Sequence, residues 1–188
     1  MLNTISVVRK KKYVVDDEEI ILKSEPMKTI GYNHQSKLLY EKTIAQTDMK
    51  TPCPSINVIV INEDCLVLYE KLVSEGYRPL LSNMANVTNP EGGYRKDRSE
   101  RLYCTTKCEL KQSTTFDEYY LMKEFGAIYT SGITVFRQTE VNGYAFMKNH
   151  LYNVCAIAMV AYRDPELTKE KMLENIFAIA HHHKHDFS

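Results

Sequence analysis

The chain has 188 residues, of which 44% are hydrophobic and 26% are charged, as is ordinary for a soluble domain with its own core. Its 24 basic and 24 acidic side chains balance, so composition excludes an overall basic footprint for nucleic acid. No apolar run reaches the roughly 18–20 residues of a membrane span, and no signal-peptide pattern opens the chain. We therefore expect an intracellular protein, cytoplasmic or nuclear, with no direct nucleic-acid contact and no membrane segment.

Cysteine and histidine are the first candidates for a metal site. The five cysteines are odd in number and lack a secretory signal, which favours reduced thiols. Cys104 and Cys108 would share a helical face, but no second Cys/His pair lies near them in the sequence. His181 and His185 would lie one turn apart in an ideal helix, but no acidic partner stands at metal-site spacing, and a polar helix end explains them better. We expect neither a metal nor a cofactor.

The signals are weak before residue 55 and become clearer after it. Short strands are predicted at Lys12–Val15 and Ile20–Leu22, and a helix with one polar face at 35–47. The β-branched run Ile56–Ile61 predicts a strand. The basic run Arg9–Lys12 is followed closely by four acidic residues, so we interpret it as solvated surface.

The next segment predicts a helix with clear limits. Asp64 is placed to cap its N-terminus, apolar residues recur at helical spacing from Leu66 to Val73, and Gly76 ends it. Pro79–Leu81 is then expected to form a short strand.

The second half of the chain alternates between helical and extended patterns, which indicates an α/β layered sheet. The almost wholly apolar 152–161 run is typical of a central strand covered on both faces. The expected elements are helices at 97–111 and 117–125, strands at 132–136 and 152–161 joined by a turn at Asn142-Gly143, and a helix from Asp164 to about His183.

The stretch from Asn83 to Glu100, NMANVTNPEGGYRKDRSE, is the candidate ligand site. A strand that ends in a glycine-rich turn before a helix presents backbone N–H groups to an anion. Gly92 and Gly93 would let a diphosphate approach the backbone, with the amides of Asn83 and Asn86 at the strand end. Glu100 would lie in the first turn of the next helix, where a carboxylate can donate a proton to a leaving group.

An ordinary turn before a capped helix explains the same residues. Asp97-x-x-Glu100 fits an acidic version of the capping box, and Asn-Pro-Glu-Gly is a common composition for a surface turn. Two glycines and one glutamate do not decide between the two interpretations.

A resemblance favours the ligand site. Asn83-Met-Ala-Asn-Val87, Glu91-Gly-Gly93 and Arg98-Ser-Glu100 resemble the Asn-Phe-Ala-Asn-Ala, Pro-Gly-Gly-Gly and Gln-Glu-Glu segments of the microbial-type poly(ADP-ribose) glycohydrolases. Three later segments, over a total span of about residues 35–187, are also similar to that family: Ile128–Arg137, His150–Pro165 and Ile176–Asp186.

The resemblance implies an α/β, macrodomain-like layered fold, with a central mixed sheet flanked by helices. It also implies a domain at 36–188 preceded by an N-terminal extension at 1–35. The ligand would be ADP-ribose or a poly(ADP-ribosyl)ated protein. Glu100 would be the catalytic acid/base, with these residues at the ADP-ribose site: Asn83, Asn86, Gly92, Gly93 and Ser99.

The chain departs from the family pattern at four points. Glu91 replaces the first glycine, Arg98 and Ser99 replace Gln and the first Glu, and the spacer before Glu100 is short. The chain also ends about where the family continues with a strand and a second phosphate loop, so we expect a C-terminally incomplete, truncated domain. Residues 1–35 or a protein partner would then complete the fold. These departures leave a second hypothesis, a catalytically inactive ADP-ribose reader or protein-interaction module.

Overall fold

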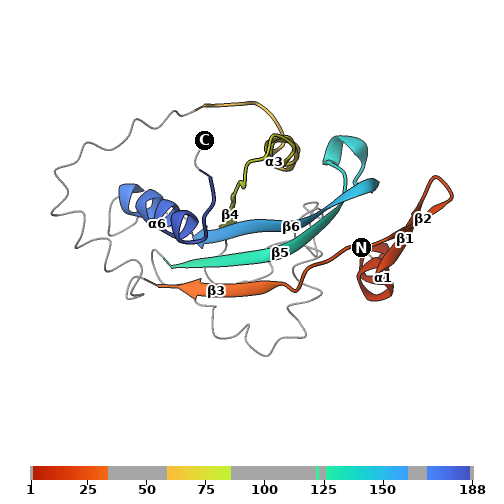
Figure 1. The fold of residues 1–188 in the computed structure, drawn as a ribbon, viewed down its shortest axis with the longest axis horizontal. Coiled ribbons are helices and arrows are strands. Elements are labelled where there is room, and N and C mark those ends of the chain that lie inside the picture. The colour runs from red at the N-terminus through yellow and green to blue at the C-terminus, as the bar shows by residue number, and fades with distance from the viewer. Residues whose placement is uncertain (1, 34–58, 86–121, 123–125, 161–168, 187–188) are drawn as a thin grey trace.

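A computed structural model of the chain describes residues 2–33, 59–85, 122, 126–160 and 169–186. These residues form an α/β structure (Figure 1). Its elements in chain order are α1 (Leu2–Lys10), β1 (Lys12–Val15), β2 (Glu18–Ile21), β3 (Lys28–Tyr32), α3 (Cys65–Ser74), β4 (Leu81–Ala85), β5 (Ala127–Arg137), a 3-10 turn (Glu140–Asn142), β6 (Phe146–Val160) and α6 (Lys169–His182).

The main sheet has the strand order β3-β5-β6-β4. The β3–β5 and β5–β6 pairs are antiparallel, whereas β4 and β6 run parallel, so the sheet is mixed. β5 and β6 have 11 and 15 residues and form the centre of the sheet (Figure 1). The predicted layered α/β fold with a central mixed sheet is confirmed.

β5 contains an irregularity that redirects its second half. The register to β6 shifts between Thr130 and Ile133, and Gly132 there has a φ of +79°. A Cβ on Gly132 would lie 2.8 Å from the carbonyl oxygen of Pro26. Only a glycine therefore allows the link before β3 to pass this close to β5.

One face of the sheet packs against α6. Ala127 and Tyr129 of β5 and Cys155, Ile157 and Met159 of β6 point to this face, because side chains alternate along a strand. Ile179 of α6 is fully buried against them. The buried residues of this cluster are Ala127, Tyr129, Cys155, Ile157, Met159, Ala178 and Ile179.

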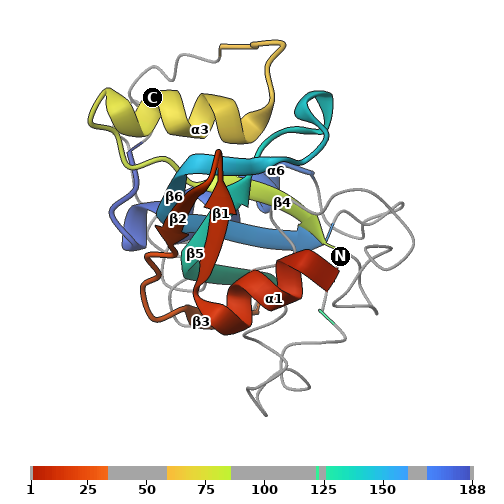
Figure 2. The same cartoon turned by 90° about the vertical axis from the view of Figure 1, so that its right-hand side faces the viewer.

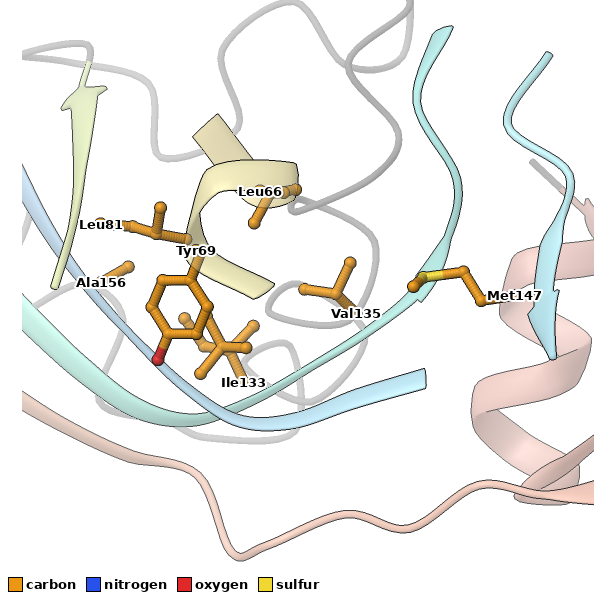
Figure 3. Close-up of a cluster of buried hydrophobic side chains, with 8 residues drawn as sticks. Leu66, Tyr69, Leu81, Ile133, Val135, Met147 and Ala156 are labelled. Carbon is orange, nitrogen blue, oxygen red and sulfur yellow. The ribbon is translucent and has the colours of Figure 1, made fainter. Parts of the chain in front are cut away.

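The cluster around α3 packs against the other face. Asp64 caps α3, since its Oδ1 accepts from the N–H groups of Leu66 at 2.9 Å and Val67 at 3.2 Å. Leu66 and Tyr69 then point from the helix towards the sheet (Figure 3). The buried cluster comprises Leu66, Tyr69, Leu81, Ile133, Val135, Met147, Val154 and Ala156.

The amino-terminal elements pack where β5 ends and β6 begins, in the foreground of Figure 2. Tyr13 and Phe136 belong to a third buried cluster there. The guanidinium of Arg137 donates to the buried Thr4 hydroxyl at 2.6 and 2.9 Å and to the Tyr144 carbonyl at 2.6 Å. Residues 28–32 add the edge strand β3, so the amino-terminal segment contributes directly to the sheet.

Most element predictions that fall on described residues are confirmed. The hairpin strands, the Asp64 cap, the turn at Gly143, the two long strands and the end of α6 all occur. β5 and β6 extend beyond the predicted segments, and β4 begins only at Leu81. The expected helices at 35–47, 97–111 and 117–125 and the Asp164 helix start lie outside the described residues, apart from Met122, which belongs to no helix.

The strand predicted at Ile56–Ile61 is wrong for its described part. Residues 59–62 have no regular structure, and Val60 is 93% exposed. β-branched residues favour a strand only where a neighbour covers them, and in the described part of the chain no strand pairs with this run.

Candidate functional site

One edge of the main sheet meets the candidate ligand segment. Because β4 and β6 are parallel, their carboxyl ends lie at the same edge, where β5 begins and β3 ends. Tyr32, Ala127, Met159 and Met84 form one row of paired residues across the sheet there. The chain leaves β4 after Ala85 and enters the candidate segment at this edge, the position at which open α/β sheets bind ligands.

Asn83 is the candidate residue that the structure describes. It lies in β4 opposite Ala158, on the same face as Leu81 two residues earlier, and is half-buried. Asn86, Gly92, Gly93, Ser99 and Glu100 lie outside the described residues. Their predicted roles stay predictions.

A cluster of tyrosine and histidine side chains joins the end of α6 to the sheet. Tyr32 Oη and His183 Nε2 are 2.8 Å apart, and Tyr129 Oη and His185 Nε2 are 3.0 Å apart. The His183 ring stacks on the Tyr129 ring, with centroids 3.7 Å apart and planes at 4°. His185 Nδ1 is 3.0 Å from the carbonyl oxygen of Arg78.

Burial keeps this cluster uncharged. It lowers the pKa of His183 to about 4, and the neighbouring His182 and His185 lower it further. Burial also lowers the pKa of His185 and raises the pKa values of Tyr32 and Tyr129. Neutral imidazoles and phenols at neutral pH make this cluster a set of packing and hydrogen-bond contacts.

The pairing of His181 with His185 on one helical face is not formed. α6 ends at His182, Lys184 has a φ of +57°, and His185 is buried while His181 is exposed. Among the described residues, no three His, Cys, Asp or Glu side chains gather in a way that could hold a metal ion.

The contribution of Tyr32 and Tyr129 to this cluster is not predictable from a local pattern in the sequence. Tyr129 and His185 are 56 positions apart and Tyr32 and His183 are 151 apart, so no local pattern links them. The abundance of tyrosine, with 13 in the chain, and the four histidines between positions 181 and 185 were the available signals.

The family model for the catalytic domain of microbial-type PARG, poly(ADP-ribose) glycohydrolase, matches residues 2–138. The chain belongs to this family. The match spans more than half of the chain and includes the whole candidate segment from Asn83 to Glu100. It also includes residues 2–33, so α1 to β3 lie within the matched region. The predicted domain boundary between residues 35 and 36 lies outside the described residues and stays a prediction.

Solved PARG structures share the fold. The PARG of Thermomonospora curvata has a TM-score of 0.67 at 16% identity, over 98% of this chain and 74% of that one. A structure of that enzyme bound to the inhibitor ADP-HPD scores 0.66 at 14% identity, over the same shares of both chains. The PARG of Deinococcus radiodurans in complex with ADP-ribose scores 0.53 at 12% identity, over 96% and 72%. Comparison with curated proteins gives no match.

No helix in the described part of this PARG-family chain combines the length and apolar character needed to cross a membrane. Cys65 and Cys155 are free thiols, as predicted for these two cysteines.

Proposed function

We propose that this chain binds ADP-ribose and hydrolyses the ribose–ribose O-glycosidic bonds of poly(ADP-ribose). The observation that carries the proposal is the family match over residues 2–138, because it spans the segment from Asn83 to Glu100. The ligands in two of the related structures, ADP-HPD and ADP-ribose, support this class of substrate. The natural substrate would then be a poly(ADP-ribosyl)ated protein.

The sheet supports the binding half of the proposal. β4 carries Asn83 two residues before its carboxyl end at Ala85, and the sequence then continues to Gly92 and Gly93. We assign the backbone N–H groups of that glycine turn to the diphosphate, since glycine leaves room for close approach. We assign the side-chain amides of Asn83 and Asn86, with the Ser99 hydroxyl, to further polar contacts with ADP-ribose.

Glu100 is the proposed acid/base. Its carboxyl group would donate a proton to the leaving oxygen as the glycosidic C–O bond breaks, through an oxocarbenium-like state. The resulting carboxylate would take a proton from the water that attacks the sugar carbon, which returns Glu100 to its acid form. One carboxylate suffices if the bound diphosphate holds the sugar in place.

A second candidate function is an ADP-ribose reader or protein-interaction module without catalysis. Three residues favour it: Glu91 adds a carboxylate beside an anionic diphosphate, and Arg98 and Ser99 stand where the family pattern has Gln and Glu. Repulsion at Glu91 would weaken binding, and the two replacements would alter contacts to the terminal ribose.

Replacing Glu100 distinguishes the two candidates. We expect Glu100→Ala to retain ADP-ribose binding by calorimetry and to lose the release of ADP-ribose from poly(ADP-ribosyl)ated protein. Glu25→Ala, an exposed carboxylate between β2 and β3, is the control and should match the unmodified chain in both assays. Turnover that survives in Glu100→Ala would refute the catalytic assignment. Saturable binding without turnover in the unmodified chain would support the reader.

A further inference from the structure

The backbone N–H and carbonyl groups of Arg78 both form hydrogen bonds with His185 or Asp186, which follow α6. Its N–H donates to Asp186 Oδ2 at 2.7 Å, and its carbonyl oxygen accepts from the Asp186 N–H at 3.1 Å. The same carbonyl accepts from the ring of His185 at 3.0 Å. Arg78 lies in the connector between α3 and β4, 108 positions before Asp186.

His185 links this connector to the centre of the sheet. A carbonyl oxygen can only accept, so Nδ1 of His185 carries the proton that points to Arg78. In the neutral ring Nε2 is then the acceptor, and the Tyr129 hydroxyl donates to it at 3.0 Å. His185 is only 6% exposed, so solvent does not compete for these two bonds. The imidazole therefore bridges β5 and the connector.

β4 depends on this connector for its position. It has five residues and, in the described part of the chain, pairs with β6 alone. It begins three residues after Arg78 and carries Asn83 in its centre. Leu81 packs the start of β4 into the α3 cluster, and the rest of this short strand is held by its few ladder bonds, so we expect a displaced Arg78 to displace β4.

We propose that His185 and Asp186 are positioning residues for the ligand site. They hold Arg78 to the sheet, fix β4 against β6, and so set the place at which Asn83 meets ADP-ribose. We call the contacts of His185 and Asp186 with Arg78 the connector clamp. The inference rests on the proposed function for its ligand, but the clamp itself is measurable without ligand.

Substitutions of Asp186 test the connector clamp, because its carboxylate is exposed and is distant from Asn83 in the sequence. Asp186→Ala removes the acceptor for the Arg78 N–H, and Asp186→Asn keeps an oxygen acceptor there. Because a solvent-exposed hydrogen bond contributes modestly, we expect Asp186→Ala to raise the ADP-ribose Kd about three- to tenfold. Asp186→Asn should restore most of the affinity. Glu70→Ala, an exposed carboxylate on the preceding helix, is the control and should leave Kd unchanged.

His185 offers a matched pair of variants that separates its two contacts. Asparagine places its side-chain nitrogen near the position of Nδ1, and glutamine places its polar end near Nε2. His185→Asn thus keeps the donor to Arg78, whereas His185→Gln keeps the contact with Tyr129. We expect weaker ADP-ribose binding for His185→Gln than for His185→Asn, although both lose one hydrogen bond.

Amide hydrogen exchange measures the effect of the connector clamp on β4 in the absence of ligand. In Asp186→Ala and His185→Gln we expect exchange at Ser82 to Ala85 to accelerate about tenfold, while the amides of β5 stay as protected as in the unmodified chain. Unchanged β4 exchange, or equal acceleration throughout the sheet, would overturn the inference. If the unmodified chain fails to bind ADP-ribose, the proposed function fails, and β4 exchange still decides whether the clamp exists.

Discussion

The backbone conformation and the surroundings of Gly132 leave no room for a side chain at this position. Its φ of +79° lies in the left-handed region, and an added Cβ would be 2.8 Å from a backbone oxygen and 3.1 Å from the Met27 Cα. Backbone atoms cannot rotate away as a flexible side chain would. The close approach of the Pro26 link to β5 therefore depends on the absence of a side chain.

We expect Gly132→Ala to lower the unfolding free energy by about 2–3 kcal/mol, from backbone strain and displacement of the Pro26 link. Gly143→Ala separates these causes, since Gly143 has a φ of +61° but no atom within 4 Å of its added Cβ. It should cost only about 1 kcal/mol. Urea denaturation of both variants measures the difference, and equal losses would show that the contact with Pro26 contributes nothing.

Single residues were predictable from sequence where the cause is local. Asp64 was identified as a cap because it precedes an apolar helical pattern, and the bonds it accepts come from residues two and three positions later. The His185 contacts were not predictable, because the partners Tyr129 and Arg78 are brought to it only by the packed sheet. At the candidate site, the sequence predicted a strand that ends at Leu81, whereas β4 runs to Ala85 and has Asn83 at its centre.

At the scale of elements, both apolar packing and polar side chains hold α6 against the main sheet. Its middle buries Ala178 and Ile179 on the sheet, and its end adds the imidazole of His183, stacked on Tyr129. Desolvation disfavours a charge on that ring, so docking of the helix end and protonation of His183 oppose each other.

This opposition predicts a dependence of stability on pH. The pKa of His183 is about 4 in the folded chain and near the ordinary 6.5 when unfolded, so between these values the unfolded state binds more protons. The unfolding free energy should therefore fall as pH decreases from about 6.5 to 4. The pKa values of His150 and His185 are also lowered by burial and act in the same direction.

Urea denaturation across this pH range measures how steeply the unfolding free energy changes with pH. His183→Gln should make this slope shallower. His181→Gln, an exposed position on the same helix, is the control for the substitution itself. The groups that face His183 are Tyr32 of β3, Tyr129 of β5, and the neighbours His182 and His185. An imidazole of His183 that titrates near 6.5 by NMR would contradict the assigned cause.

Helices and strands were predicted well where the apolar residues follow one clear pattern along the sequence. α3 and α6 follow helical spacing, and the long apolar run of β6 identified a central strand. The Ile56–Ile61 prediction failed for its described part because β-propensity measures fit to a covered surface, and no described strand pairs with this run. No local pattern could predict that β3 joins the main sheet, since its partner β5 lies about a hundred positions later.

At the scale of the whole molecule, the α/β class and the family were predictable because motif residues and strand patterns agreed. The structural contribution of the amino-terminal elements was underestimated: α1 and β1 anchor to β5 and β6 through Thr4 and Tyr13. These contacts join residues more than 130 positions apart, so they follow from the fold alone. The roles of Gly92, Gly93 and Glu100 remain predictions from the family pattern.

The central claim is that this chain binds ADP-ribose at the carboxyl edge of its sheet. Calorimetric titration of ADP-ribose into the purified chain, after circular dichroism confirms folding, tests it most directly. We expect saturable binding with one site per chain, and weaker binding in Asn83→Ala. A folded chain that releases no binding heat at several temperatures would contradict the claim, and would mean that the family fold is present without its ligand site.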